Sequence, residues 1–478
     1  KTKLFSRFVS EKSIEKASDW LEKNGASAIF LSRFITGFRL PTYLAAGFLR
    51  TNFLKFTIYF FIATAIWTPI LVGSTSLAGQ FFFSKNLFIS IVLTFILLKT
   101  ILHFSSWKNR RLFVGRLKRI KNWEFWSLKV FYFPVVIYVL FLAIRHRSLT
   151  IFTCANPAIL ASGFVGESKD EIYQNLKKSP ANSDFLLPHI LLKSESSLSS
   201  KISQVWEFID DNKLDFPLVL KPNAGERGKN VKIAQTYSEL KKELEEINDD
   251  FILQEFYDGI EASIFYFRYP NEEKGKIFSI TEKRFPSLLG DGKSNIEELI
   301  LSDERAVCLA KKYFEQNLER LNYIPKRDEE TQIINIGTHS RGATFLEGEW
   351  LKTPKLEEKI DEICQRFAGF YFGRFDIRAK SFADLQSGQN FKIIELNGVT
   401  SESTNIYDPK YSLLSAYQIL FRQWKIAFEI GQQNYDKGCR PTSVFQLLQL
   451  IAENSFGFGK KSETQKTETK NVSDSFRV

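Results

Sequence analysis

The chain has 478 residues and a formal net charge of +11, from 65 lysines and arginines against 54 aspartates and glutamates. This length is too great for one ordinary hydrophobic core, so we expect two or three folded units. Residues 1–150 hold 22 basic residues against 5 acidic ones, so they carry +17 and the remainder carries −6. Because this basic part is also apolar and rich in phenylalanine, it indicates an anionic lipid partner and argues against nucleic acid.

The cysteines indicate neither a disulfide framework nor a zinc site. Cys154, Cys308, Cys364 and Cys439 are widely spaced, with no CxxC pair and no histidine at metal-ligand spacing. We interpret them as reduced thiols of a protein that faces the cytosol. The sequence begins at a lysine and contains no methionine, so we expect its true start to be missing.

Three apolar runs, at 53–73, 86–104 and 126–144, predict membrane helices. Their lengths are close to the ~20 residues that a spanning helix needs. Basic clusters and tryptophans flank the runs, which favours the membrane over the alternative of buried core helices in a soluble protein.

The charges around the third run give conflicting orientations. The basic stretch 105–124 should be cytoplasmic, and a spanning helix at 126–144 would then put the rest of the chain outside. Arg145 and Arg147, just after the run, favour the cytoplasm as well, so the charges at its two ends disagree. Lys129 near the start of this run and Pro134 in its middle also allow a re-entrant or interfacial segment. We expect the C-terminal part to face the cytoplasm.

From about residue 151 the charge becomes mixed, and short strand-like runs alternate with helical ones. Apolar alternation predicts strands at 217–222, 251–256, 262–269, 275–281, 331–337 and 391–396, and helical spacing predicts helices at 240–248, 357–370 and 411–430. This alternation is typical of an α+β or α/β catalytic domain. The tail after about 456 has few large apolar residues, so we expect it to be disordered.

The N-terminal segment resembles the second half of the DedA family of membrane proteins, also called the SNARE-associated or VTT domain family. The resemblance covers about residues 11–80 and rests on Arg33, Gly37, Arg39, Pro41, Ala46, Gly47, Phe56 and Trp67. Arginines inside an apolar stretch are costly in lipid, so they should face a polar cavity or pair with acids, unless they reach the headgroups at a helix end. The glycines and the proline fit a re-entrant segment.

The C-terminal part resembles the ATP-grasp superfamily, in the branch that contains D-alanine–D-alanine ligase, cyanophycin synthetase and glutathione synthetase. The resemblance covers about 160–425, with the motifs VLKP, QEF, GRFDIR and IIELNG in the family's order. It implies that Lys221 binds the nucleotide phosphates and that Lys283, or alternatively Arg284, is a second phosphate ligand. The implied mobile loop contains Gly225, Arg227 and Gly228, the adenine hinge is Gln254, Glu255, Phe256 and Tyr257, and Glu261 holds the ribose hydroxyls.

The same resemblance implies a metal site and a catalytic arginine. Asp376, Glu395 and Asn397 would hold two Mg²⁺ ions, with Mn²⁺ as the alternative, and Arg374 would stabilise the tetrahedral intermediate. Residues two apart on a strand share one face, so Glu395 and Asn397 can meet the same metal cluster. In GDGKSNIEELI the turn is equally well explained as helix capping by Ser294 or Asn295.

The sequence indicates less about the acceptor substrate than about the ATP site. His339 and Arg341 lie in a Gly-flanked loop that the resemblance places near the acceptor, although a solvent-exposed loop is an equal alternative. Ser401 belongs to the segment 400–404, which stands where related ligases have a Pro-Gly turn, so we expect an acceptor other than D-alanine.

Together these features predict an α-helical membrane region followed by an α+β ATP-grasp domain. The expected divisions are a partial DedA-like domain at 1–84, transmembrane or interfacial helices with a basic loop at 85–150, the ATP-grasp domain at 151–430, and a C-terminal helix and tail at 431–478. The predicted protein is a multi-pass inner-membrane ligase that joins a small carboxylate to an amine or a thiol through an acylphosphate. The alternatives are a lipid-handling transporter that senses nucleotide and an ATP-grasp kinase. No oligomeric state is predicted.

Overall fold

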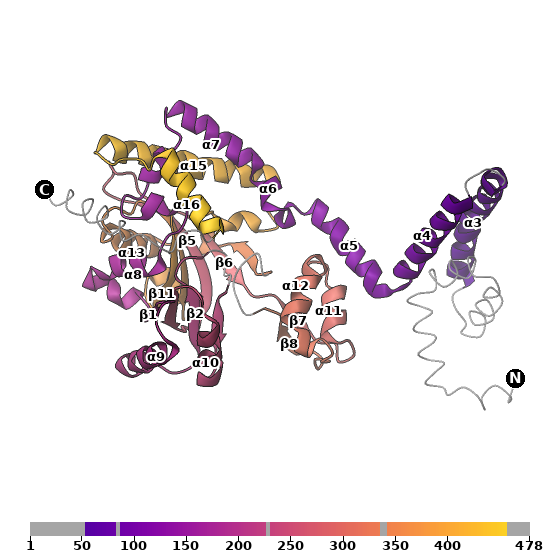
Figure 1. Cartoon of the computed structure of the whole chain (residues 1–478), viewed down its shortest axis with the longest axis horizontal. Coiled ribbons are helices and arrows are strands. Elements are labelled where there is room, and N and C mark those ends of the chain that lie inside the picture. Colours follow the sequence, from indigo (N-terminus) through magenta and orange to yellow (C-terminus); the bar gives the residue numbers. More distant parts are fainter. Residues whose placement is uncertain (1–52, 83–86, 226–229, 335–341, 457–478) are drawn as a thin grey trace. The chain divides into compact units, whose positions relative to one another are not determined.

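The computed structural model describes residues 53–82, 87–225, 230–334 and 342–456 (Figure 1). The chain divides into two compact units, Lys1–Ser106 and Trp107–Val478. The predicted DedA-like residues Arg33, Gly37, Arg39, Pro41, Ala46 and Gly47 lie outside the described residues.

The described part of the first unit consists of two apolar helices, α3 (Phe53–Phe82) and α4 (Leu87–Ser105). Within the described residues, one segment, Phe56–Gly73 of α3, is long and apolar enough to cross a membrane, and 6% of it is buried. The apolar segment identified in α4, Thr94–Ser105, is shorter. The sequence predicts three membrane spans. Among the described residues, one of them is both long and apolar enough to cross a membrane.

The third apolar run belongs to the second unit and does not form one continuous helix. It divides into α6 (Leu128–Phe131) and α7 (Phe133–Arg145), which follow the basic helix α5 (Trp107–Lys121). α7 packs along α15 (Leu413–Asp436), where the rings of Tyr138 and Phe421 stack with centroids 4.4 Å apart (Figure 1). At ~1.5 Å per residue α7 is about 20 Å long, short of the ~30 Å hydrocarbon layer. Its length and packing fit the interfacial alternative.

Two antiparallel sheets form the body of the second unit. The four-stranded sheet has the order β1-β4-β2-β3, with β1 at His189–Leu192, β2 at Leu218–Pro222, β3 at Lys232–Ala234 and β4 at Phe251–Glu255. The five-stranded sheet has the order β11-β10-β5-β6-β9, with β5 at Ile260–Phe267, β6 at Lys276–Arg284, β9 at Thr344–Glu347, β10 at Phe372–Ala379 and β11 at Phe391–Asn397. A small ladder joins β7 (Ser287–Leu289) to β8 (Glu330–Gln332).

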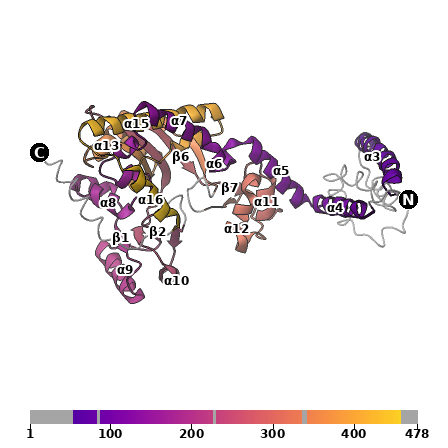
Figure 2. The same cartoon turned by 45° about the horizontal axis from the view of Figure 1, so that its top comes forward.

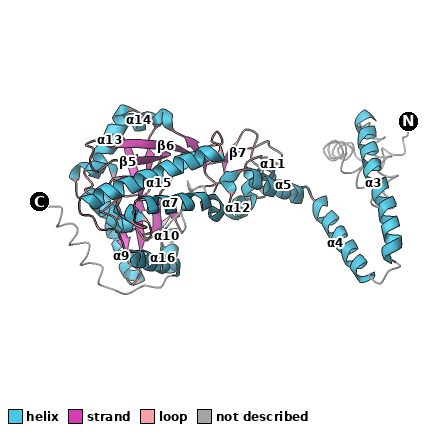
Figure 3. Cartoon of the chain, turned by 90° about the horizontal axis from the view of Figure 1, so that it is seen from above, coloured by secondary structure: helices cyan, strands magenta, loops and turns pink. Residues whose placement is uncertain are grey.

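Helices surround these sheets (Figure 3). They are α8 (Lys169–Lys177), α9 (Leu198–Asn212), α10 (Tyr237–Glu246), α11 (Ile296–Ser302), α12 (Ala310–Gln316), α13 (Pro354–Gln365), α14 (Phe382–Ser387), α15 and α16 (Val444–Phe456). Asn295 begins α11 with a capping box to Glu298, so the turn before it caps a helix, as one of the two sequence interpretations predicts.

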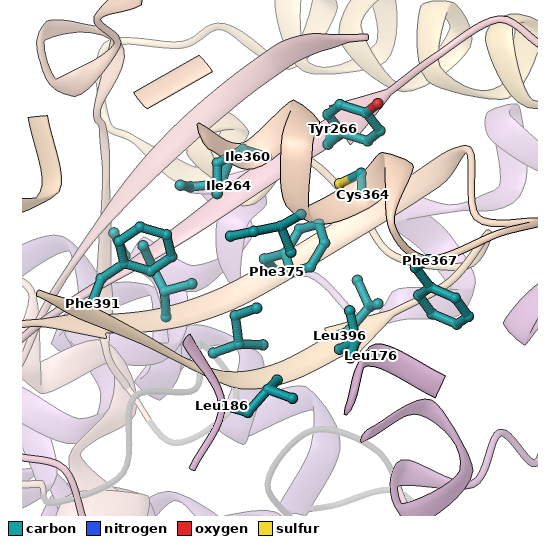
Figure 4. Packing of buried hydrophobic residues seen from close by; sticks show 14 of the residues in the cluster. Leu176, Leu186, Ile264, Tyr266, Ile360, Cys364, Phe367, Phe375, Phe391 and Leu396 are labelled. Carbon is teal, nitrogen blue, oxygen red and sulfur yellow. The ribbon is translucent and has the colours of Figure 1, made fainter. Parts of the chain in front are cut away.

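The largest hydrophobic core lies on one face of the five-stranded sheet. Alternate residues of β5 and β10, among them Ile264, Tyr266 and Phe375, pack against Ile360 and Cys364 of α13 (Figure 4). Because successive side chains of a strand point to opposite faces, the other residues of these strands lie on the other face of the sheet. Phe265, Phe267 and Phe372 form part of a second core on that face, and the polar remainder of the face carries the predicted site.

Candidate functional site

Strand register brings the predicted metal and catalytic residues together on the polar face. Asp376 lies directly opposite Glu395 of β11 on one side and Ser263 of β5 on the other. Arg374 lies opposite Asn397 in the same ladder. Residues directly opposite one another in a ladder share a face, so the pairs predicted from GRFDIR and IIELNG are neighbours in the sheet.

Asp376 is the centre of a buried ion-pair network. Its carboxylate lies 3.2 Å from Lys283 Nζ and 3.2 Å from Arg374 Nε, and it accepts a hydrogen bond from Ser263. Burial opposes ionisation of Asp376, but Arg374 and Lys283 outweigh it and hold the pKa of the carboxyl well below its usual range. Burial alone would lower the pKa of Lys283. The negative charges of Asp376 and Glu261 together outweigh burial, so the pKa of Lys283 is raised.

Glu261, the predicted ribose ligand, is buried between two cations. Lys283 Nζ lies 3.0 Å from its Oε1, and Arg378 Nη2 lies 3.2 Å from its Oε2. Arg378 also donates to the carbonyl of Tyr257 at 2.9 Å and stacks 5.0 Å above the Phe256 ring. Arg378 therefore connects the acidic residue to the predicted adenine hinge.

Lys221 lies at the end of β2 and bridges the two sheets. Its Nζ donates to Gln254 Oε1 of β4 at 2.8 Å and to the carbonyl of Ile394 of β11 at 2.8 Å, and it lies 3.3 Å from the Tyr173 hydroxyl. Burial lowers the pKa of Lys221 to about 8, partly offset by the negative charge of Glu395. The ammonium is therefore charged at neutral pH at a substantial desolvation cost.

Lys169 is a cation that the sequence interpretation did not include. It is the first residue of α8 and is buried, and its Nζ lies 2.8 Å from the carbonyl oxygen of Gly225 and 3.2 Å from Glu395 Oε1. It thus joins the start of the predicted phosphate loop to a predicted metal ligand. Arg227 and Gly228 of that loop lie outside the described residues, as do His339 and Arg341 of the predicted acceptor loop.

The segment after β11 contains a second group that the sequence interpretation did not include, Glu402. Tyr407 donates to its Oε1 at 3.1 Å, and Tyr132, between α6 and α7, donates to its Oε2. Burial raises the pKa of Glu402 to about 7, although the Tyr407 hydrogen bond acts in the opposite direction. The backbone oxygen of Glu402 accepts from Arg374 at 3.1 Å, whereas the Ser401 hydroxyl donates to the carbonyl of Gly398.

The donor set fits a hard divalent cation. Asp376 and Glu395 supply carboxylates and Asn397 an amide, and these are oxygen ligands that Mg²⁺ accepts. The Asn397 Nδ2 atom is buried and has no hydrogen-bond partner among the described residues, so this N–H donor is available to an acceptor such as a phosphate oxygen. Among the described residues, no three His, Cys, Asp or Glu side chains lie together as a metal site would need.

The ion-pair network carries an excess of positive charge. Apart from Glu255 and Glu402, which form none of these pairs, five cations surround three carboxylates; they are Lys169, Lys221, Lys283, Arg374 and Arg378 around Glu261, Asp376 and Glu395. Such a site attracts a polyanion, as the phosphates of a nucleotide require. Two antiparallel sheets that meet at a buried lysine, with an Asp and a Glu-x-Asn pair in register, are the arrangement that the resemblance to the ATP-grasp superfamily implies.

Comparison with protein families identifies both parts of the chain. Residues 1–77 match the VTT domain, and residues 178–265 match the RimK-like ATP-grasp domain. The chain therefore carries a VTT (DedA) domain at its N-terminus and a RimK-like ATP-grasp domain after it, which confirms both resemblances. The second match includes Lys221, the predicted hinge and Glu261, and it ends before β10 and β11, which carry the predicted metal ligands.

The similarity to individual proteins is low in sequence identity and covers only part of each chain. Undecaprenyl phosphate transporter A of Staphylococcus aureus is 28% identical over 122 residues, which are 24% of this chain and 55% of that protein. The chain thus spans about half the length of this curated relative. Among solved structures, D-alanine–D-alanine ligase of Bacillus anthracis has 15% identity and a TM-score of 0.34 over 57% of this chain and 69% of that one. A bifunctional glutathione synthetase of Pasteurella multocida has 14% identity and a TM-score of 0.31 over 53% and 36%.

Proposed function

We propose that this protein is a membrane-tethered ligase that activates a carboxylate with ATP and transfers the acyl group to an amine or a thiol. The observation that carries the proposal is the register of β10 and β11, which sets Asp376 against Glu395 and Arg374 against Asn397 beside buried Lys283. A domain that only senses nucleotide would not need an arginine beside the metal residues.

Each group of the site has a definite part in this reaction. Lys221, Lys169 and Lys283 would bind phosphate oxygens and hold the transferred phosphoryl group against the carboxylate. Asp376, Glu395 and Asn397 would hold magnesium ions, which when bound offset the negative charge of the β- and γ-phosphates. In the second step Arg374 would stabilise the oxyanion that forms when the nucleophile attacks the acylphosphate.

Binding of the phosphates requires a rearrangement of the ion pairs. In the described arrangement Lys283 and Arg374 neutralise Asp376, and Lys169 neutralises Glu395. A cation bound to these carboxylates would take over that role, so the basic side chains would become available to phosphate oxygens. We therefore expect nucleotide and metal to bind cooperatively.

Glu395→Gln is the sharpest test of this proposal. The Glu395 side chain is 29% exposed and pairs with Lys169, so its loss should disturb the fold less than loss of the buried Asp376. We expect the full chain in nanodiscs to lose Mg²⁺-dependent ATP binding at least about tenfold, which corresponds to 1.4 kcal/mol. Glu362→Gln, which removes a surface acid paired with Lys359, is the control and should bind as the unmodified chain does. Unchanged Mg²⁺-dependent binding in Glu395→Gln would overturn the proposal.

A ligase and a kinase differ in where an oxygen atom of the substrate carboxylate ends up. With a carboxylate substrate labelled with ¹⁸O, ligation through an acylphosphate moves one labelled oxygen into the released inorganic phosphate. A kinase would instead leave the phosphoryl group on its product. We would apply this test to whichever amino acid, peptide or lipid-linked carboxylate stimulates phosphate release.

The VTT domain favours a second candidate function, the handling of a lipid phosphate. The S. aureus relative is named as an undecaprenyl phosphate transporter, and this chain covers about half of it. Lipid-phosphate uptake into vesicles that persists in Glu395→Gln would indicate an activity separate from the ATP site. We further propose that the ATP-grasp domain faces the cytoplasm, so protease added outside sealed right-side-out vesicles should leave it intact.

A further inference from the structure

The outer face of α7 exposes a continuous stripe of large apolar side chains. Its members recur at intervals of one helical turn and are 51–78% exposed; they are Phe133, Val136, Ile137, Leu140, Phe141 and Ile144. The inner face of α7 is buried at Val135, Leu142 and Ala143, and Tyr138 stacks on α15. Packing of the inner face fixes the orientation of the helix, so its outer stripe is a property of the folded unit.

A second apolar stripe runs along α5. Phe113, Leu117 and Ile120 are 43%, 51% and 70% exposed, again one helical turn apart. The opposite side of α5 is attached to the body of the unit at Gly115, where an added Cβ would lie 2.4 Å from the carbonyl oxygen of Val307. α5 is also held by Arg111, whose Nε donates to the Leu301 carbonyl at 2.6 Å.

Basic residues border the stripe of α5. The helix contains seven lysines and arginines and no acidic residue. Arg116, Arg119 and Lys121 are exposed, and no acidic side chain in the described part of the chain forms an ion pair with them. By contrast, Lys108 and Lys118 on the attached side pair with Glu297 and Glu304. Arg116, Arg119 and Lys121, beside the apolar stripe, are therefore available to an anionic partner.

We propose that the outer face of α5 and α7 rests on an anionic phospholipid bilayer, with α7 lying in the plane of the membrane. Figure 2 shows α5, α6 and α7 following one another along one edge of the second unit. Large apolar patches on a folded surface mark interaction sites, and apolar side chains flanked by lysine and arginine are typical of interfacial helices. Phospholipid headgroups supply the negative charge that the cations beside the stripe require.

This placement resolves the conflict in the topology. If α7 lies along the surface, the basic helix α5 and the ATP-grasp sheets stay on the same side of the membrane, as both the charge rule and the ATP requirement demand. The inference concerns a surface away from the ion-pair network. It does not depend on the reaction proposed above.

Site-specific quenching tests the inference on the full chain. In a Cys439→Ser background the other three cysteines are buried, so one introduced cysteine can carry an environment-sensitive fluorophore. Val136→Cys, Ile144→Cys and Leu117→Cys probe the face, and Trp206→Cys on α9, 47% exposed, is the control. In liposomes with phosphatidylglycerol and spin-labelled lipid, we expect at least threefold more quenching at the three probes than at the control.

Two outcomes would overturn the proposal. One is equal lipid quenching at the probes and at Trp206→Cys, which would mean that the face remains in water. The other is shielding of Val136→Cys and Ile144→Cys from both lipid quencher and aqueous iodide, which would mean that another part of this chain covers the stripe. Neither result involves ATP, so failure here is distinct from failure of the ligase proposal.

The role of charge is tested by reversal. The triple change Arg116→Glu, Arg119→Glu, Lys121→Glu should reduce quenching at Leu117→Cys and abolish its dependence on phosphatidylglycerol. Reversal of Lys241 and Lys242 on α10 is the matched control and should have no effect. Quenching at Leu117→Cys that stays equally dependent on phosphatidylglycerol after the triple change would contradict the electrostatic part of the proposal.

Discussion

Replacing Lys221 with methionine should stabilise the ligand-free protein while removing its affinity for ATP. The pKa of Lys221 falls from 10.5 to about 8 because the ammonium is buried. A shift of one pKa unit corresponds to ~1.4 kcal/mol, so holding the charge in this site at pH 7 costs about 3 kcal/mol. Methionine removes that cost and has a similar length.

The lost hydrogen bonds offset part of this gain. Gln254 Oε1 and the Ile394 carbonyl each lose the donor at 2.8 Å, at about 1 kcal/mol apiece. The Ile394 carbonyl keeps the hydrogen bond donated by Tyr173, which limits the loss. We therefore expect Lys221→Met to raise the free energy of unfolding by about 1 kcal/mol at pH 7 and the melting temperature by a few degrees.

The pH dependence gives a second check with a definite sign. Below pH 8 Lys221 is charged in both the folded and the unfolded chain and carries the full burial cost. Between pH 8 and 10.5 the folded chain loses this proton while the unfolded chain keeps it, so the free energy of unfolding of the unmodified protein rises relative to the variant. The advantage of Lys221→Met should thus be largest below pH 8 and shrink above it.

Differential scanning fluorimetry from pH 6 to pH 10, with ATP titrations at pH 7, measures these effects. Lys232→Met on β3 is the matched control, because Lys232 lies in the same sheet, is half exposed and pairs with Glu243. It should leave both melting temperature and ATP affinity unchanged. A Lys221→Met protein that melts well below the unmodified protein at pH 7, or binds ATP equally well, would refute the reasoning.

Three further changes test other parts of the structure. Asp376→Asn leaves buried Lys283 with Glu261 as its one remaining acid and half-buried Arg374 beside a neutral group, so it should lower the free energy of unfolding by about 3 kcal/mol, and an unchanged thermal melt would contradict this. The raised pKa of Glu402 means that the folded chain keeps a proton between pH 4.5 and 7 that the unfolded chain releases, so this contribution to stability is complete below pH 4.5 and lost as pH rises through 7. Glu402→Gln should flatten that decline in melting temperature, and an unaltered pH profile would argue against the assignment. Gly115→Val should detach α5 and expose it to protease, because a Cβ there would clash with backbone, and unchanged proteolysis would oppose this packing.

The sequence predicts the longer strands well because they are apolar on one side throughout. The runs at 217–222, 251–256 and 391–396 overlap β2, β4 and β11 closely. The strands β1, β3, β7 and β9, of three or four residues each, were not predicted. The longer β10 was identified by its motif GRFDIR and not as an apolar run, and the run 331–337 overlaps β8 at two residues. Strands this short owe their conformation to the partner strand, as β1 does to β4, and their own residues carry little periodicity.

The sequence identifies the candidate site residues that lie in strand motifs. It misses those that only the packing of distant segments brings to the site. Asp376 and Glu395 were identified by motif, and the register of β10 and β11 makes them neighbours. Lys169 and Glu402 lie on a helix start and a loop without a motif, so only the folded chain brings them to the site. One signal was available for Lys169, because a lysine at the first position of a helix opposes the helix dipole and needs a compensating acid, which Glu395 provides.

Glu402 connects the segment that we place on the membrane to the predicted catalytic arginine. Its side chain is held by Tyr132, the residue between α6 and α7, and its backbone by Arg374. A shift of α7 on the bilayer would therefore move the loop that follows β11, together with Arg374. The segment 400–404, in which we expect an acceptor other than D-alanine to be recognised, is thus connected to the helix that we place on the lipid.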